Sequence, residues 1–214
     1  MQIKVVTNVL KANEDMAKAN RELLKERGIK VINLISSPGA GKTTILERTV
    51  EKLKDEIPMA VIEGDLMTTK DAERIFNHGV PVVQINTRGG CHLDANMVNK
   101  ALKELPLDNI KLLIIENVGN LVCPSSFDLG EDLKVVVLSV PEGDDKPLKY
   151  PTTFKKADLC ILNKIDFLPV SNFNLESFYK DVASLNEEMQ VFAMSAWKEE
   201  GMQEWFDYLR KLVQ

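Results

Sequence analysis

The sequence has few cysteines and no long apolar run. Its 214 residues include three cysteines, which cannot complete a disulfide framework, so a reducing compartment and thiol or metal chemistry are favoured. No segment approaches the roughly twenty apolar residues that a membrane-spanning helix needs. The first twenty residues carry acidic side chains where an export signal needs an uninterrupted apolar run. We therefore expect a cytoplasmic chain without a targeting peptide or a membrane segment.

The chain also lacks a basic excess, internal repeats and a Pro/Ser-rich linker. Lys and Arg together number 27 against 32 Asp and Glu, which gives a formal charge of −5. This balance disfavours nonspecific nucleic-acid binding, because such binding needs basic side chains that displace counterions from phosphates. The length suits one sizeable core. We expect a single domain over residues 1–214 and no nucleic-acid partner.

Short apolar runs alternate with helical patterns along most of the chain. The runs cover residues 31–35, 59–62, 80–85, 112–115, 135–140, 159–162 and 191–194. Such alternation predicts an α/β fold with a mainly parallel sheet flanked by helices on both faces. An amphipathic helix is expected over about 9–27, either packed on the domain or free as a partner-binding arm, and a last helix over 202–212.

A glycine-containing loop follows the first predicted strand. Residues 36–43 read SSPGAGKT and precede a helical run, which is the context that a phosphate-binding loop requires. Gly39 and Gly41 let backbone N–H groups turn toward phosphate oxygens, Lys42 supplies an ammonium group, and the Thr43 hydroxyl suits Mg²⁺. Ala40 and Thr44 complete the expected phosphate contacts. Ser36 replaces the glycine that usually opens this loop.

A second motif indicates guanine as the base. Asn163, Lys164 and Asp166 form an NKxD pattern after a late strand, and ligands bind at the carboxyl ends of strands in such sheets. The Asp166 carboxylate can accept hydrogen bonds from the guanine ring N–H and amino group, which adenine does not present in that arrangement. Ser195 and Ala196 resemble a weaker element whose backbone N–H meets the guanine carbonyl. GTP and GDP are therefore the expected nucleotides.

Acidic residues follow two further strands, where Mg²⁺ and the γ-phosphate are expected. Asp65 is the candidate Mg²⁺ ligand, and Glu116 with Gly119 occupies the place of a DxxG switch, although either acid could instead cap a helix or turn. Hydrolysis is expected by in-line attack of water, stabilised by Mg²⁺ and Lys42. The sequence identifies no arginine finger, so we expect slow turnover, of order 10⁻⁴ to 10⁻³ per second.

Two of the cysteines and a histidine form a candidate site for a soft metal. Cys91 and His92 stand where a helix is expected to begin, and Cys123 follows the Gly119 switch closely. Two thiolates and an imidazole favour Zn²⁺, Ni²⁺ or copper, and three ligands leave a position open. The alternative is two ordinary cysteines. Cys160 is expected in the core, and His78 at a helix end.

The motifs as a set resemble the nickel-insertion GTPases of hydrogenase maturation, the HypB family of SIMIBI-class P-loop GTPases. The likeness covers nearly the whole chain and rests on residues 36–43, 63–65, 91–92, 116–120, 123–124, 142–145 and 163–166.

The resemblance implies a SIMIBI-type G domain and a GTP-dependent homodimer. It further implies a nickel or zinc site shared at the subunit interface with Cys91, His92 and Cys123 as ligands, and delivery of nickel to a hydrogenase large subunit with a second metallochaperone. The sequence lacks the cysteine-rich motif and histidine-rich tract of some relatives, which favours metal transfer over storage.

Three other functions remain open at this stage. A P-loop kinase would share the phosphate loop but would not need the NKxD motif or the paired cysteines. A GTPase chaperone could serve another metalloenzyme, such as urease or a cobalamin enzyme. The metal could also be a structural zinc clip in a protein that only binds nucleotide.

Overall fold

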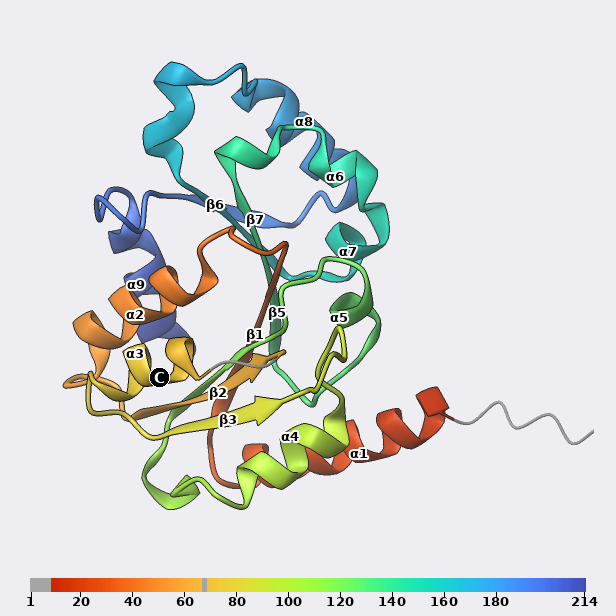
Figure 1. Ribbon diagram of the computed structural model, residues 1–214, viewed down its shortest axis with the longest axis vertical. Helices are drawn as coiled ribbons and strands as arrows, with labels where there is room; N and C mark the ends of the chain where they lie inside the picture. The colour runs from red at the N-terminus through yellow and green to blue at the C-terminus, as the bar shows by residue number, and fades with distance from the viewer. Residues whose placement is uncertain (1–8, 67–68) are drawn as a thin grey trace, which may run out of the picture.

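The structure is a computed structural model that describes residues 9–66 and 69–214 as helices packed on one parallel sheet (Figure 1). Residues 1–8, which entered the expectation of no targeting peptide, lie outside this described part. The strands are β1 (Lys30–Ser36), β2 (Met59–Asp65), β3 (Val82–Asn86), β4 (Leu112–Glu116), β5 (Leu133–Ser139), β6 (Leu159–Asn163) and β7 (Gln190–Ala193). They lie in the order β3-β2-β4-β1-β5-β6-β7, all parallel, which confirms the expected fold class.

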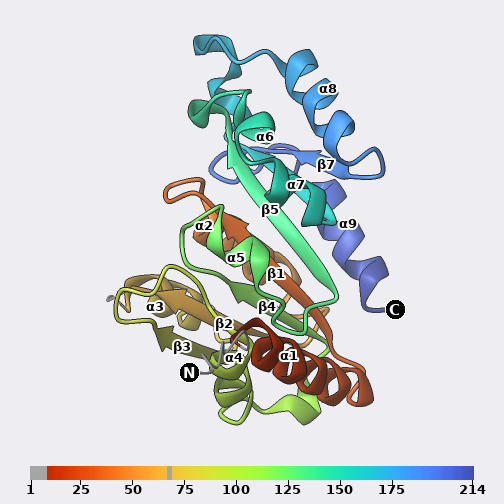
Figure 2. The same cartoon turned by 90° about the vertical axis from the view of Figure 1, so that its right-hand side faces the viewer.

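Helices cover both faces of the sheet (Figure 2). One face is covered by α2 (Lys42–Leu53), α3 (Lys70–Phe76) and α9 (Met202–Leu212), whose apolar side chains join one buried cluster with alternate strand residues. The other face is covered by α1 (Val9–Glu26), α4 (Ala95–Leu102), α7 (Pro151–Lys156) and α8 (Leu175–Leu185). Shorter helices are α5 (Cys123–Ser126), α6 (Lys146–Lys149) and three 3₁₀ turns, Leu107–Asn109, Val140–Glu142 and Ile165–Val170.

The first helix packs on the domain through one side. Ala17 and Leu24 are buried, and Leu23 packs against the apolar cluster to which Leu24 belongs, whereas Leu10 is 54% exposed. Of the two arrangements left open by the sequence, the packed helix is the one observed. No helix within residues 9–66 and 69–214 has the length and apolarity to cross a membrane.

Several predicted boundaries differ from those observed, and two of the differences have a clear local cause. The third run was expected to begin at residue 80, but β3 begins at Val82, after Pro81, which has no N–H to donate to a ladder. The helix expected to begin near Cys91 begins at Ala95 instead, because the Asp94 side chain caps it by accepting from Met97 N–H at 2.7 Å. Cys91 and His92 therefore lie in the preceding loop.

The sheet topology brings the predicted motifs to one edge. β1 lies between β4 and β5. The chain runs from β1 to β2 toward one edge of the sheet and from β5 to β6 toward the other, and ligands bind at such a switch point. The phosphate loop follows β1 there. The ladder places Glu63 of β2 opposite Glu116 of β4, beside Leu34 of β1.

Candidate nucleotide and metal site

The phosphate loop joins β1 to α2 with two glycines in the left-handed region. Gly39 has φ 79° and Gly41 φ 100°, a conformation that L side chains rarely adopt. A Cβ on Gly41 would also lie 2.4 Å from the side-chain nitrogen of Asn163. The conformation of the phosphate loop is therefore restricted by its own glycines and by the close approach of Asn163.

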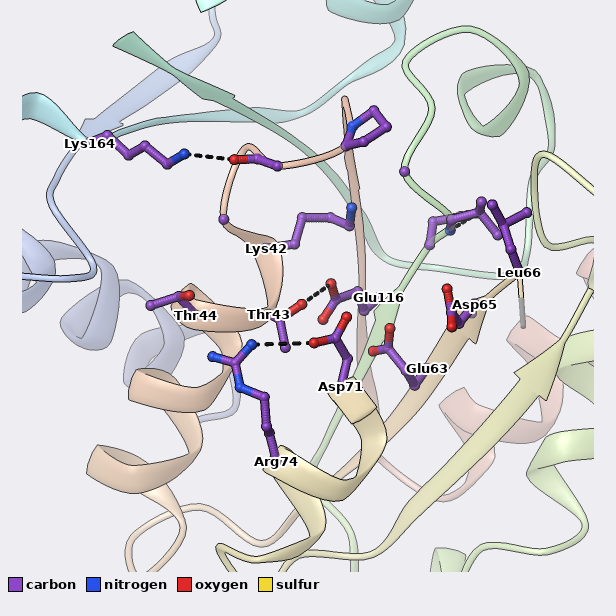
Figure 3. A pocket seen from close by; sticks show the side chains of 17 residues that line it. Lys42, Thr43, Thr44, Glu63, Asp65, Leu66, Asp71, Arg74, Glu116 and Lys164 are labelled. Carbon is purple, nitrogen blue, oxygen red and sulfur yellow. Dashed lines mark hydrogen bonds and ion pairs between the residues drawn. The ribbon is translucent and has the colours of Figure 1, made fainter. Parts of the chain in front are cut away.

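The lysine and threonine of the loop lie beside a cavity of about 470 Å³. Lys42 donates to the Ser36 hydroxyl at 2.8 Å, and Thr43 donates to Glu116 Oε1 at 2.8 Å (Figure 3). The serine that replaces the usual first glycine is thus a partner of the lysine. The lining includes Gly39, Gly41, Lys42, Thr43, Thr44, Asp65, Glu116 and Gly119 from the predicted set. Ala40 lies in the loop and is fully buried.

Two glutamates meet at the floor of this cavity. Glu63 and Glu116 are both buried and lie opposite each other in the ladder, with their carboxyl groups close enough to interact. Burial, and then the charge of Glu116, raises the pKa of Glu63 to about 11, and burial likewise raises the pKa of Glu116. Without a cation the pair therefore holds a proton at neutral pH.

We expect Glu63→Gln to stabilise the nucleotide-free protein. The pKa of Glu63 is higher in the folded than in the unfolded protein. The contribution of its protonated carboxyl to stability is therefore complete only below the unfolded pKa, and it is lost as the pH rises toward the folded pKa. Glutamine cannot ionise, so the variant should melt a few degrees higher, with a gain that grows from about pH 5 to about pH 9. Thermal unfolding across that range measures it. Glu104→Gln, an exposed change of the same charge, is the control, and a wild-type pH slope in the Glu63 variant would contradict the expectation.

The cavity has donors and acceptors that fit a magnesium-bound nucleotide. Glu63 Oε2 and Glu116 Oε2 are buried without a partner, and carboxylate and hydroxyl oxygens are what Mg²⁺ prefers. Sequence reasoning chose Asp65, which lines the cavity, and missed Glu63, because the ladder register that pairs Glu63 with Glu116 is not readable from one strand.

An arginine and an aspartate of α3 also line this cavity and were missed. Arg74 donates to Asp71 at 3.3 Å and to Glu47 of α2 at 2.6 Å. Figure 3 shows Arg74 pointing toward the Thr43 side of the cavity with Asp71 next to it. The sequence offered no signal for either, since charged residues are ordinary on a short exposed helix.

The NKxD motif borders a second cavity of about 360 Å³. Asn163 donates to Ala40 O at 2.9 Å and accepts from Ala196 N–H at 3.0 Å, so it braces two loops. Lys164 donates to Gly39 O at 2.7 Å. Asp166 Oδ1 is buried and has no partner, which fits a base that presents N–H groups.

The Ser195–Ala196 element differs from the expectation. Ser195 N–H donates to Glu200 O at 2.9 Å, Ala196 N–H donates to Asn163, and neither residue lines the base cavity. Their backbone therefore has no N–H directed at a guanine carbonyl in this arrangement. Phe167 and Trp197, 46% and 77% exposed, line the cavity instead. Sequence reasoning missed both, because an aromatic after a motif is usually packed in a core.

The candidate metal residues converge. Ligand atoms of Cys91, His92 and Cys123 all lie within 4.8 Å of one another. The first two lie in the loop before α4, and Cys123 is the first residue of α5. His92 also stacks on Phe127, with ring centroids 3.8 Å apart, a contact that sequence spacing did not indicate.

The electrostatics of this cluster suit a soft cation. Burial, partly offset by Asp94, lowers the pKa of His92, which keeps the imidazole neutral with a lone pair available. A hydrogen bond with Cys91, and then burial, raises the pKa of the Cys123 thiol. A metal ion must therefore displace a thiol proton, and acid should weaken its binding.

The other cysteine and histidine have the structural positions expected. Cys160 is fully buried in β6, and burial raises the pKa of its thiol. His78 lies two residues after the end of α3, with its Nε2 3.6 Å from Glu47 Oε1. Neither belongs to the metal cluster.

The fold and the phosphate loop together define a P-loop nucleotide-binding protein. A family model described as "CobW/HypB/UreG, nucleotide-binding domain" matches residues 30–193. The hydrogenase maturation factor HypB of Escherichia coli K12 is 51% identical to this chain, and the match covers 97% of this chain and 71% of the relative. The probable hydrogenase maturation factor HypB of Methanocaldococcus jannaschii is 40% identical, and the match covers 99% of this chain and 96% of the relative. The chain belongs to the CobW/HypB/UreG family and, within it, groups with the HypB hydrogenase maturation factors.

Solved structures agree with this assignment. HypB from Helicobacter pylori in complex with nickel is 42% identical with a TM-score of 0.89, covering 95% of this chain and 97% of that one. HypB from Archaeoglobus fulgidus is 38% identical with a TM-score of 0.90, covering 96% and 100%. The signal recognition particle receptor FtsY of Elizabethkingia anophelis, 16% identical with a TM-score of 0.58 and covering 100% and 76%, shares the fold alone.

Proposed function

We propose that this chain is a GTP-binding and GTP-hydrolysing metallochaperone that helps insert nickel into a hydrogenase. The observation that carries the proposal is the Cys91–His92–Cys123 cluster, whose ligand atoms lie within 4.8 Å of one another, with Cys123 shortly after Gly119 of the nucleotide cavity. The names of the relatives, hydrogenase maturation factors, and the nickel complex of one of them support the cargo and the client.

GTP hydrolysis would use the phosphate loop and the acids around it. Water attacks the γ-phosphorus in line, while Lys42 and loop N–H groups stabilise the developing charge. Lys42 must leave Ser36 to do so. Thr43 and Asp65, joined by the Glu63–Glu116 pair, would hold Mg²⁺, which neutralises phosphate charge when bound. With no arginine assigned to the transition state, we expect slow turnover, of order 10⁻⁴ to 10⁻³ per second.

The base would be read by the NKxD residues. Asp166 would accept the guanine N–H groups with its unpartnered oxygen, and Lys164 would lie along the base. Asn163 would act indirectly, by holding the phosphate loop through Ala40. A preference for GTP over ATP follows, because adenine would leave the Asp166 oxygen desolvated and unpaired.

Nickel would be cargo, held by three soft ligands with one position open for a partner's donor. Such a site also accepts Zn²⁺. An open position suits transfer, because a closed four-ligand site must lose a ligand before it releases its metal. The three ligands lie on one chain, and a second copy could supply the fourth, which is consistent with the GTP-dependent homodimer that we propose.

The wider setting is proposed on the same basis. The chain would act in the cytoplasm as one domain, with a second nickel metallochaperone and a hydrogenase large subunit as partners, and without a membrane or nucleic-acid partner. A urease is the second candidate client. The name of the Helicobacter pylori relative, hydrogenase/urease maturation factor HypB, 43% identical to this chain, favours it.

The proposal is tested by the Ni²⁺ affinity of the protein in two nucleotide states. Chelator competition with Mg²⁺-GDP and with a Mg²⁺-bound non-hydrolysable GTP analogue should give dissociation constants that differ at least about fivefold. The Gly119 switch lies a few residues before Cys123, so reordering the switch would move a metal ligand. Equal affinity in both states would reduce the protein to a GTPase with an independent metal site.

A further inference from the structure

Leu93, the residue after His92, is held by the nucleotide site from two directions. Its backbone N–H donates to the Asn117 side-chain oxygen at 3.1 Å, and Asn117 is the residue after Glu116. Its side chain is fully buried against Gly64 of β2, where an added Cβ would meet it at 2.8 Å. The loop that carries Cys91 and His92 therefore rests on the strand ends that carry the two glutamates of the nucleotide cavity.

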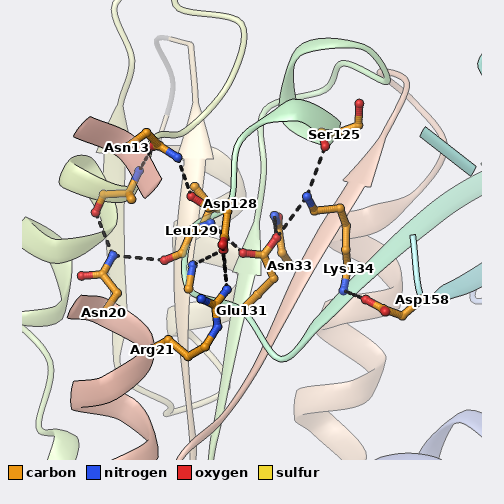
Figure 4. Close-up of polar contacts among 12 residues, drawn as sticks. Asn13, Asn20, Arg21, Asn33, Ser125, Asp128, Leu129, Glu131, Lys134 and Asp158 are labelled. Carbon is orange, nitrogen blue, oxygen red and sulfur yellow. Dashed lines mark hydrogen bonds and ion pairs between the residues drawn. The ribbon is translucent and has the colours of Figure 1, made fainter. Parts of the chain in front are cut away.

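The Asn117 amide also begins a second buried connection, which leads toward Cys123. Its nitrogen donates to Asn33 Oδ1 at 3.2 Å, and the Asn33 nitrogen donates to Glu131 Oε1 at 3.1 Å. Glu131 pairs with Lys134 at 3.4 Å, and Lys134 donates to Ser125 O at 3.2 Å. Figure 4 shows this path from Asn33 through Glu131 and Lys134 to Ser125. Ser125 belongs to α5, the short helix that begins with Cys123.

Asn117 therefore connects the switch after β4 both to the loop that carries Cys91 and His92 and to α5, which carries Cys123. It is buried and its oxygen also accepts from Val118 N–H at 3.0 Å. Gly119, two residues on, lies against Pro38 of the phosphate loop, 3.2 Å from where its Cβ would be. A γ-phosphate that displaces residues 117–119 would carry the Asn117 amide with them, and leaving its buried partners unpaired is costly.

We infer that Asn117 is the positioning residue that transmits the nucleotide state to both halves of the Cys/His site. One arm moves His92 through Leu93, and the other moves α5 through Asn33, Glu131 and Lys134. The inference rests on the proposed function, since it requires a metal at the Cys/His cluster and a nucleotide at the phosphate loop.

A matched control is available on the first helix. Asn20 donates to Ala95 O at 2.8 Å and to Leu129 O at 3.1 Å, so it ties the start of α4 and the segment after Phe127 to α1. Like Asn117 it is a buried asparagine whose side chain bonds more than one distant segment of the chain. It has no bond to the switch, however, so its loss should loosen the metal site in both nucleotide states alike.

The test measures Ni²⁺ affinity by chelator competition, with Mg²⁺-GDP and with the Mg²⁺-bound GTP analogue, for the wild type and three variants. The wild-type ratio of the two dissociation constants should be at least about fivefold. Asn117→Ala should bring this ratio within about twofold of one, compared at saturating nucleotide because Asn117 itself lines the nucleotide cavity. Asn33→Ala, which cuts only the Cys123 arm, should give an intermediate ratio. Asn20→Ala should weaken nickel in both states and keep the wild-type ratio.

Folding is checked by thermal unfolding before affinities are compared. A folded Asn117→Ala protein with the wild-type ratio overturns the inference and leaves the proposed function standing. If the wild-type protein itself gives a ratio of one, the nucleotide state does not change the nickel affinity, and the inference is overturned. If Asn117→Ala does not fold, Asn33→Ala decides, because a wild-type ratio in that variant overturns the transmission to Cys123 and a reduced one supports it.

Discussion

Replacing Asp166 by Asn is expected to move the base preference of the protein from guanine toward xanthine. The unpartnered Asp166 oxygen suits two N–H donors, and guanine presents them at its ring nitrogen and its amino group. Xanthine has a carbonyl in place of that amino group, so an asparagine can accept from the ring N–H and donate to the carbonyl. GTP affinity should fall at least about 100-fold, within the limit of about 10⁵ for sites built to hydrogen-bond a ligand, and the affinity for the xanthosine nucleotide should rise.

Competition among GTP, xanthosine triphosphate and ATP for a fluorescent nucleotide measures this preference. Asp207→Asn is the control, because it removes the same charge from an exposed aspartate of α9 that bonds Gln203 and Arg210. Unchanged GTP affinity in Asp166→Asn would mean that this carboxylate does not read the base. Equal losses for all three nucleotides would point instead to a collapsed phosphate loop.

Removing either thiol of the metal cluster should give the second large effect. Cys91→Ala or Cys123→Ala leaves only two of the three soft ligands, and Ni²⁺ affinity should fall at least about 100-fold, because losing an outer partner of a ligand already costs 10- to 100-fold. The absorption band of thiolate bound to nickel should weaken in each variant. Nickel titration followed by absorbance and by chelator competition gives both quantities.

The third cysteine provides the matched control. Cys160 is fully buried in β6, so Cys160→Ala should lower stability through a small cavity and leave nickel affinity within about twofold. If Cys160→Ala weakened nickel as much as Cys91→Ala, loss of folding rather than loss of a ligand would explain both. If neither Cys91 nor Cys123 mattered, nickel would bind elsewhere.

Most of the fold was predictable because it rests on local patterns. The sheet strands are mainly apolar, as expected of strands covered by helices on both faces, and α9 spans the residues expected of it. The phosphate loop and the NKxD motif were also local, since each places its chemistry within a few residues of a strand end.

The remainder of the site depends on contacts between distant segments. Glu63 became significant only through its register with Glu116, and Ser195 and Ala196 donate their N–H groups to protein acceptors that the sequence does not reveal. The bond between Leu93 and Asn117 spans 24 positions. A single sequence carries no periodicity that encodes such pairs, so the coupling between the two sites became visible only in three dimensions.

The lack of a side chain at Gly64 links the evolution of the nucleotide site to that of the metal site. Its backbone has an ordinary φ, so the phosphate loop does not demand glycine there, and the constraint comes from Leu93 of the metal loop. A larger residue at position 64 would be tolerated only with a smaller one at position 93. Across related sequences these two positions should therefore change together, and a family member that loses its metal loop should lose the requirement for glycine in its nucleotide strand.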